Sequence, residues 1–378
     1  MQLVAYGAQD IYLTGNPQIT FFKVVYRRHT NFSMESIEQT LRGKVALGNR
    51  VTATISRNGD LVSRLYLQTQ IDVSTGAFNP GHTIINSVEV EIGGQKIDKH
   101  FGHWMEVWAE LTEPNSAGLT GAITTTAAAS GTKFQNMARA GGVGINGANN
   151  VVAYVPLQFW FCRNPGLALP LIALQYHEVK VILELQGSLT GITLDSLSMW
   201  ADYIYLDTDE RRRFAQVSHE YLIEQVQHST ASSTSAELNF NHPVKELVWT
   251  GAYAAATGFR TSLDTGNFQL KLNGHDRFAE RSCDYFTKTQ VWQHHTGTPV
   301  KGTAAVLAAA ARTASATDIA VYSFALKPEE HQPSGTCNFS RIDNAQLKTP
   351  NNNKLHIYAV NYNVLRIMSG MGGLAYSN

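Results

Sequence analysis

Hydrophobic and polar residues alternate in short runs along most of the chain. The clearest runs lie at residues 51–55, 65–71, 88–92, 179–185 and 355–360. They are rich in β-branched and aromatic residues and are separated by Gly, Pro and Asn. Because successive side chains of a strand point to opposite faces, a period of two predicts strands with one buried face. The pattern therefore predicts a mainly β protein.

One segment has the period of a helix instead. Between Phe101 and Glu113 the large apolar residues recur every three or four positions, and Pro114 follows. This spacing places the apolar side chains on one face of a helix that ends before the proline. We expect a short helix over 101–113 that packs over the end of a sheet.

The chain also contains a faint internal duplication. Four features recur in the same order: an Ile-Glu-Gln triplet, a strand ending in a Gly-Gly or Asn-Gly turn, a Pro-x4-Pro segment and a closing alternating strand. The first copies lie at 37–39, 90–94, 165–170 and 199–206, and the second copies at 223–225, 270–274, 328–333 and 355–362. The sequence thus predicts two copies of one β unit, the second with shorter loops.

Each copy has the length and strand spacing of a β-sandwich, and a jelly roll fits best. We expect a double jelly roll, two eight-stranded antiparallel β-sandwiches in tandem with a few short helices. A polar segment at 207–214 is predicted to form a helical connector, so the first roll should cover 29–215 and the second 216–378. Four stretches rich in Gly, Ala, Ser and Thr should form exposed loops, at 120–132, 141–150, 229–235 and 301–317.

Composition narrows the possible functions. The 378 residues include 30 basic and 30 acidic side chains, so the net charge is zero and direct nucleic-acid binding is not expected. Three scattered cysteines do not form a disulfide framework. The first residues lack a secretory signal, and no apolar run is long enough to insert into a membrane. We expect a protein made inside the cell and not inserted in a membrane.

Few residues suggest chemistry. His100, His103 and Glu106 are spaced by three on the predicted helix, but no strand offers a further ligand, so we interpret them as solvated or capping side chains rather than a metal site. His294 and His295 are adjacent and would face opposite sides of a strand.

Other catalytic and cofactor signals are also weak. The run Gly142 to Gly147 matches the dinucleotide fingerprint, but a turn and a strand follow it instead of a helix. No Gly-x-Ser-x-Gly elbow is present, and Cys162 has the apolar neighbours of a core residue. The sequence predicts neither an enzyme nor a cofactor.

Two basic clusters remain. Arg211–Arg213 follow three acidic residues and are interpreted as a salt-bridged connector. Lys23, Arg27 and Arg28 alternate with aromatic residues and have no acidic neighbour before Glu35. They are our candidate interaction residues, in an arm that docks onto a protein partner or a polyanion, although an ordinary edge strand would have a similar pattern.

Several longer motifs resemble the major capsid proteins of the nucleocytoplasmic large DNA viruses, most closely those of the algal, chlorella-virus type. The motifs run from the beginning of the chain to its end. They are Leu3–Phe32, Ser56–Asp60, Ile92–Asp98, Asn164–Val179, Gln332–Asp343 and Asn361–Leu374.

This resemblance implies a structural function. Family members have two jelly rolls side by side, and three chains form a capsomer with a six-sided outline. Capsomers make lateral contacts and tile the outer icosahedral shell of the virion, which encloses an internal membrane and is assembled in the host cytoplasm. Residues 1–28 would be an N-terminal arm on the inner side, near minor capsid proteins.

Two alternatives belong to other functional classes. A metal-dependent jelly-roll enzyme would present a His-x-His pair, which the chain lacks. A carbohydrate-binding jelly roll would carry aromatic clusters in its loops, whereas these loops are mostly Gly, Ala, Ser and Thr. Fold alone does not separate these functions.

Overall fold

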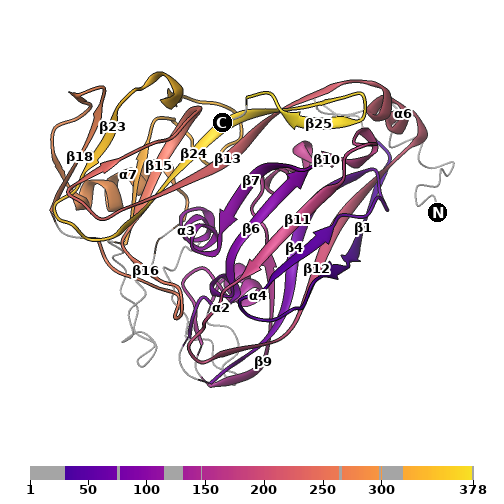
Figure 1. The fold of residues 1–378 in the computed structure, drawn as a ribbon, viewed down its shortest axis with the longest axis horizontal. Helices are drawn as coiled ribbons and strands as arrows, with labels where there is room; N and C mark the ends of the chain where they lie inside the picture. Colours follow the sequence, from indigo (N-terminus) through magenta and orange to yellow (C-terminus); the bar gives the residue numbers. More distant parts are fainter. Residues whose placement is uncertain are drawn as a thin grey trace, which may run out of the picture.

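The protein consists of two β-sandwiches that lie side by side (Figure 1). The computed structural model describes residues 30–74, 77–114, 131–145, 147–263, 266–297, 299 and 318–376. The candidate interaction residues Lys23, Arg27 and Arg28, the proposed arm over 1–28, and the stretches 120–130 and 301–317 lie outside the described residues.

The first sandwich packs two antiparallel sheets against each other. One sheet has the order β1 (Phe32–Gln39), β12 (Ile192–Leu206), β4 (Leu61–Val73), with β9 (Ala148–Pro156) and β10 (Leu169–Pro170) both paired to β4. The other has the order β2 (Leu41–Arg42), β3 (Arg50–Thr54), β11 (Val179–Leu185), β6 (Ile85–Ile92), β7 (Gln95–Phe101). Alternate residues of both sheets form one core, as the period of two predicted.

The second sandwich repeats this arrangement. Its first sheet has the order β13 (His219–Ala231), β24 (Leu355–Met368), β15 (Pro243–Thr250), β21 (Ile319–Ser323), with β22 (Cys337–Asn338) on β15 and β25 (Met371–Leu374) on β24. Its second sheet has the order β14 (Ser235–Glu237), β23 (Ala345–Lys348), β18 (Asn267–Leu272), β19 (His275–Asp276), with β20 (Arg281–Ser282) on β18.

The duplicated sequence features occupy equivalent places in the two rolls. The Ile-Glu-Gln triplets lie in β1 and β13, which pair with the closing strands β12 and β24. The two turns join β6 to β7 and β18 to β19. Their residues have left-handed φ angles, 58° and 86° at Gly93 and Gly94 and 51° and 77° at Asn273 and Gly274. A tight hairpin requires such angles, so the predicted turns are confirmed.

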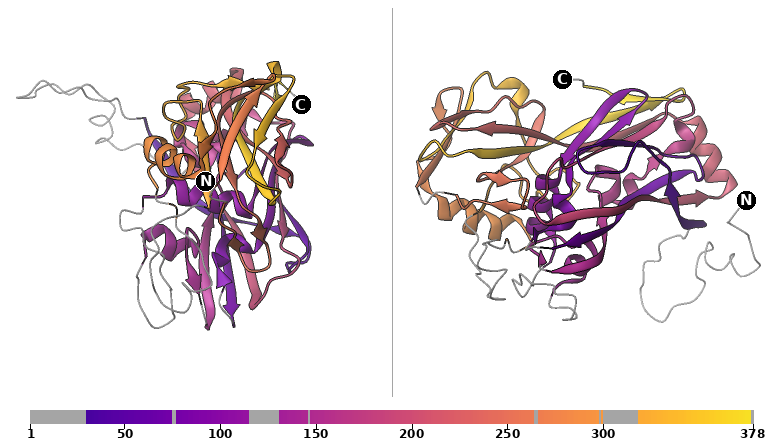
Figure 2. Two further views of the ribbon diagram at one scale, coloured as in Figure 1. Left: turned by 90° about the vertical axis from the view of Figure 1, so that its left-hand side faces the viewer. Right: turned by 60° about the horizontal axis from the view of Figure 1, so that its bottom comes forward.

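The long strands of the second roll also reach the first. Ile223 of β13 and Leu365 and Ile367 of β24 pack in the core of the first roll. Figure 2 shows these strands from two further sides. Strands of the second roll thus contribute side chains to the core of the first. They join the two rolls in addition to the contact described in the next section.

Helices are few and short, as expected. The described α-helices are α2 (Pro80–Thr83), α3 (Gly102–Thr112), α4 (Lys133–Ala138), α5 (Trp160–Arg163), α6 (Thr208–Gln216) and α7 (Gln290–His294), the last directly after a π-helical turn at Tyr285–Thr289. The predicted helix over 101–113 is α3. The predicted connector is α6, whose first turn is capped by Asp207 accepting a hydrogen bond from the Glu210 N–H. Among the described residues, no helix is long and apolar enough to cross a membrane.

Two predicted loops are wrong in part. Residues 229–231 belong to β13. The stretch 141–145 is buried and contains the short strand β8 (Gly144–Ile145), which pairs with β5 (Ala77–Phe78). Its glycines can be buried because their backbone N–H groups donate hydrogen bonds to buried side chains, as described in the next section.

Candidate functional site: the contact between the two rolls

Helix α3 lies between the rolls and packs against the outer face of the second one. Trp104, Val107, Trp108 and Leu111 of α3 share a buried cluster with residues of β15, β21 and β24. The ring centroids of Trp104 and Tyr358 are 5.0 Å apart. The predicted apolar face of the helix is thus confirmed, but the expected partner is wrong: α3 covers a sheet face of the other roll, not a sheet end.

The covered face follows from the strand register. Val248 of β15 pairs with both Tyr358 of β24 and Val321 of β21, so these three side chains point the same way. Their neighbours Leu247 and Trp249 point into the core of the second roll. The sheet therefore buries both of its faces, one in its own core and one under α3.

A neutral histidine cluster borders the apolar contact. The ring of His103 lies 3.0 Å from the Tyr358 hydroxyl and stacks on Tyr253 with centroids 4.3 Å apart. His228 and His356 stack beside it, with ring nitrogens 3.1 Å apart. Burial lowers the pKa values of His228 and His356 to about 4 and lowers that of His103 as well. These rings are uncharged at neutral pH.

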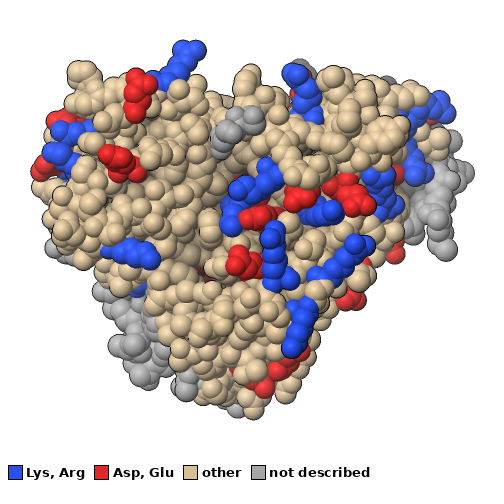
Figure 3. Space-filling view, viewed as in Figure 1, with Lys and Arg blue, Asp and Glu red and all other residues tan. Residues whose placement is uncertain are grey.

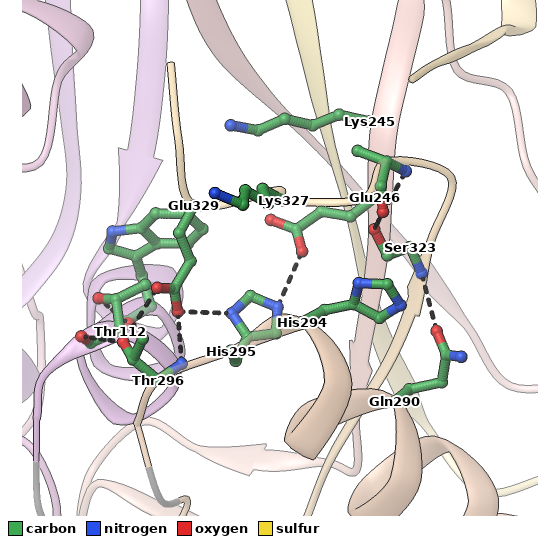
Figure 4. Close-up of polar contacts among 12 residues, drawn as sticks. Thr112, Lys245, Glu246, Gln290, His294, His295, Thr296, Ser323, Lys327 and Glu329 are labelled. Atoms are coloured by element: carbon green, nitrogen blue, oxygen red, sulfur yellow. Dashed lines mark hydrogen bonds and ion pairs between the residues drawn. The ribbon is translucent and has the colours of Figure 1, made fainter. Parts of the chain in front are cut away.

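A charged histidine closes the other side of the contact (Figure 4). His295 lies 3.0 Å from a carboxylate oxygen of Glu246 and 3.0 Å from one of Glu329. Burial alone lowers the pKa of His295, but the two carboxylates outweigh burial and raise it to about 9. Thr296, the next residue, donates its hydroxyl to the carbonyl of Thr112 at 3.0 Å and so joins this cluster to the end of α3.

A second group of charges crosses directly from roll to roll. Glu224 of β13 accepts from Arg163 of α5 at 3.0 Å and lies 2.9 Å from the Lys245 ammonium. Burial raises the pKa of Glu224, but His331, Lys245 and Arg163 together lower it to about 2. The Arg163 guanidinium also lies 4.2 Å from the ring centroid of Trp108.

A third charged contact, a buried ion pair, anchors α3 itself. Glu110 of α3 accepts from Arg260 of the second roll at 2.5 Å, and both side chains are buried. Buried ion pairs lose hydration energy, so they stabilise little on balance, but removing one partner leaves an uncompensated charge. Such pairs fix one relative placement of the two rolls, and the arrangement has the features of a rigid structural joint.

The residues considered as metal ligands are all used structurally. His100 pairs with Asp98 at 2.8 Å, and Glu106 pairs with His82 at 2.6 Å. The expectation that they are solvated or capping is wrong, because His100 of β7 and His103 and Glu106 of α3 are all buried. Among the residues described, no group of three or more His, Cys, Asp or Glu is placed to hold a metal ion.

The glycine-rich run also has a structural function. The N–H groups of Gly141 and Gly142 donate to the Glu106 carboxylate at 2.9 and 2.8 Å. In a dinucleotide-binding loop such amides would bind phosphate. Here they compensate a buried carboxylate of α3, which agrees with the absence of a following helix in the sequence.

The connector arginines and Cys162 both have structural roles. Arg211 of α6 pairs with Asp60 of the first roll at 2.8 Å, so the connector is salt-bridged to a residue distant in sequence. Cys162 is a half-buried free thiol that packs against the first core, and burial raises its pKa to about 12. A thiol with such a pKa is a poor nucleophile.

The charged contacts of the joint were not predicted from the sequence. Arg163, Glu224, Lys245, Glu246 and His295 come from four separate places in the chain. One signal was present, since Lys245-Glu246 interrupts an otherwise apolar strand. Charged residues inside such a strand are buried only with partners, and those partners were not identifiable from local sequence.

Comparisons with known proteins identify the family. Residues 20–207 match the family model described as major capsid protein N-terminus, and residues 210–373 match that of the large eukaryotic DNA virus major capsid protein. The major capsid protein of Pyramimonas orientalis virus is 55% identical over 100% of this chain and 99% of its own. That of Paramecium bursaria Chlorella virus 1 is 41% identical over the same shares.

Solved structures agree in fold. A quasi-atomic model of the PBCV-1 capsid superposes with a TM-score of 0.77 and 37% identity, covering 95% of this chain and all of the other. The Faustovirus major capsid protein shares the fold at 12% identity, with a TM-score of 0.68 and coverage of 96% and 94%. The predicted double jelly roll, and a structural protein of the virion rather than an enzyme, are confirmed. The chain belongs to the major capsid proteins of large eukaryotic DNA viruses.

Proposed function

We propose that three copies of this chain form a closed ring with six jelly rolls on its circumference, the capsomer that tiles the viral shell. The observation that carries this proposal is the contact between the rolls. A helix of the first roll lies on the outer sheet of the second, so two similar units are joined head to tail. A head-to-tail contact closes into a ring when its rotation divides a full turn, as about 60° per roll would for six rolls.

The same geometry supports a division of the chain near residue 215. Helix α6 connects the last strand of one roll to the first strand of the next, giving rolls at 29–215 and 216–378. Within the ring, contacts between chains should be of obligate size, about 2,000 Å² or more. Lateral contacts between capsomers should be smaller, so that misplaced units dissociate during assembly.

The arm over residues 1–28 is proposed to contact minor capsid proteins on the inner side of the shell. Its Lys23, Arg27 and Arg28 alternate with aromatic residues, which suits an acidic protein partner. Replacing all three with Ala should reduce incorporation into particles and leave capsomer formation intact. Unchanged incorporation would contradict this role.

The capsomer itself is tested by light scattering on a sizing column, followed by particle images of the same peak. The proposal predicts three times the chain mass of 41.6 kDa and a six-sided outline. A folded chain that stays monomeric at every concentration would contradict the proposal. Metal analysis and a glycan-binding screen of that monomer would then test the enzyme and carbohydrate-binding alternatives.

A further inference from the structure

The second roll carries a helical segment in the same topological position as α3. In each roll the segment follows the hairpin of the second sheet and precedes the next strand of the first sheet: α3 follows β7, and the Tyr285–His294 segment follows β19 and β20. In α3 the residues from Gly102 to Leu111 are buried. In the second segment Phe286 and Val291 are buried, but Trp292 is 81% exposed.

The first roll has an open sheet face that is equivalent to the one α3 covers. On the outer side of β4, Tyr66 stacks on Trp200 of β12 with ring centroids 6.5 Å apart and lies 6.4 Å from Tyr154 of β9. The register places these rings on one face, because Tyr66 pairs with Trp200 and Gln68 pairs with Tyr154. Tyr154 is 40% exposed and its neighbour Val152 39%. We call Tyr66, Tyr154 and Trp200 the aromatic face.

Charge distinguishes this face from the other outer face of the same roll. Around β6, β7 and β11, lysines and acidic residues are mixed on the surface (Figure 3), as in the Lys99–Glu89 pair at 2.8 Å. On the β9 side of the aromatic face, the neighbours of the rings are the uncharged Gln68, Gln70 and Ser198. The charged Glu38, Arg64 and Asp202 border the face on its other side, with Glu38 directly opposite Trp200. An aromatic surface with charges at its border suits a buried contact with a polar rim, whereas charges mixed throughout suit solvent.

We propose that Trp292 of one chain packs on the aromatic face of the first roll of a second copy. This inference rests on the proposed ring and identifies its seam. Within one chain, the helical segment of roll one covers the outer sheet of roll two. Between chains, the helical segment of roll two would cover the outer sheet of roll one, so the same type of contact continues around the ring. Trp and Tyr are the residues that most often dominate binding energy at interfaces.

The first test is the variant Trp292→Ala, compared with Tyr176→Ala as a matched control. Tyr176 is also an exposed aromatic residue, 76% exposed, but packs beside Gly370 in the β24–β25 turn. Sedimentation velocity over a dilution series measures dissociation of the assembly. Trp292→Ala should weaken the association by about 30-fold or more per contact, with an unchanged circular dichroism spectrum. Tyr176→Ala should match the wild type.

The second test joins the two sides covalently. The double variant Trp292→Cys, Tyr154→Cys should form disulfide-linked dimers and trimers on a non-reducing gel, and each single variant should not. If the wild type is a trimer but Trp292→Ala dissociates like the wild type and the double variant stays uncrosslinked, the seam is wrong and the ring stands. If the wild type is a monomer, the ring itself is wrong.

Discussion

The outer sheet faces of the two rolls differ although the rolls share one topology. On the second roll this face is buried beneath α3, with Val248, Val321 and Tyr358 in an apolar cluster. On the first roll the equivalent face exposes Tyr154 and Val152. This difference supports our proposal that one contact is completed within the chain, whereas its counterpart is made by a second copy. We call the contact of α3 with the second roll the finished joint, because both of its sides belong to one chain. The proposed contact of the aromatic face needs a second copy.

Replacing the anchor of the finished joint should have the largest effect. Trp104 is fully buried between the rolls, so Trp104→Ala should lower the free energy of unfolding by about 4 kcal/mol. Trp292→Ala should change the stability of the isolated chain by less than about 0.5 kcal/mol, because this side chain is exposed. Urea denaturation of both variants at a concentration where the wild type is dissociated measures this contrast. Equal losses would contradict the distinction between the joints.

Removing the carboxylate that links the rolls should have the next largest effect. Glu224→Gln leaves Lys245 and Arg163 without their counter-charge, and Lys245 is fully buried. We expect a loss of about 3 kcal/mol in the free energy of unfolding. The double variant Glu224→Gln, Lys245→Met should recover part of it. If the double variant is less stable than the single one, the buried charge is not the cause.

Alkaline pH should weaken the joint through His295. The raised pKa means that its contribution to stability is complete below about pH 6.5 and is lost as the pH rises through about 9. The loss should be about 2 kcal/mol, reduced by solvent near Glu329, which is 21% exposed. His295→Gln should flatten the stability curve over this range. The same change at the exposed His275 is the control and should leave the curve unaltered.

Acid should weaken the joint by a smaller amount through the stacked histidines. The lowered pKa values of His228 and His356 mean that their contribution is present above about pH 6.5 and is lost as the pH falls towards about 4. Both rings are partly exposed, so we expect about 1 kcal/mol from each. His228→Phe keeps a stacked ring and removes one proton site. Its unfolding free energy should therefore fall less steeply between pH 6.5 and 4 than that of the wild type.

The elements of the fold were predictable because their signals are local. Alternation identified the strands, Gly93-Gly94 and Asn273-Gly274 identified the hairpin turns, and the spacing of Trp104 and Trp108 identified α3. The recurrence of these signals also identified the two rolls. Each of these signals comes from residues that are close together in the sequence.

The joint was not predictable because its signals are tertiary. The polar side of α3 appeared solvated, but α2 and the 141–145 stretch bury it and supply partners for Glu106. Likewise, Lys245 and Glu246 find their partners in β13 and after α7, at places that only the folded chain brings together. Sequence patterns locate an apolar face but do not identify what covers it.

The most direct test of the central claim is an experimental structure of the assembled particle. One rotation superposes the first roll of a chain on the second roll of the same chain. Another rotation superposes that second roll on the first roll of the next chain. We predict that both are about 60° around a common axis and that Trp292 lies against Tyr66, Tyr154 and Trp200 of the neighbour. An assembly in which Trp292 faces solvent, or in which the two rotations differ widely, would contradict the account.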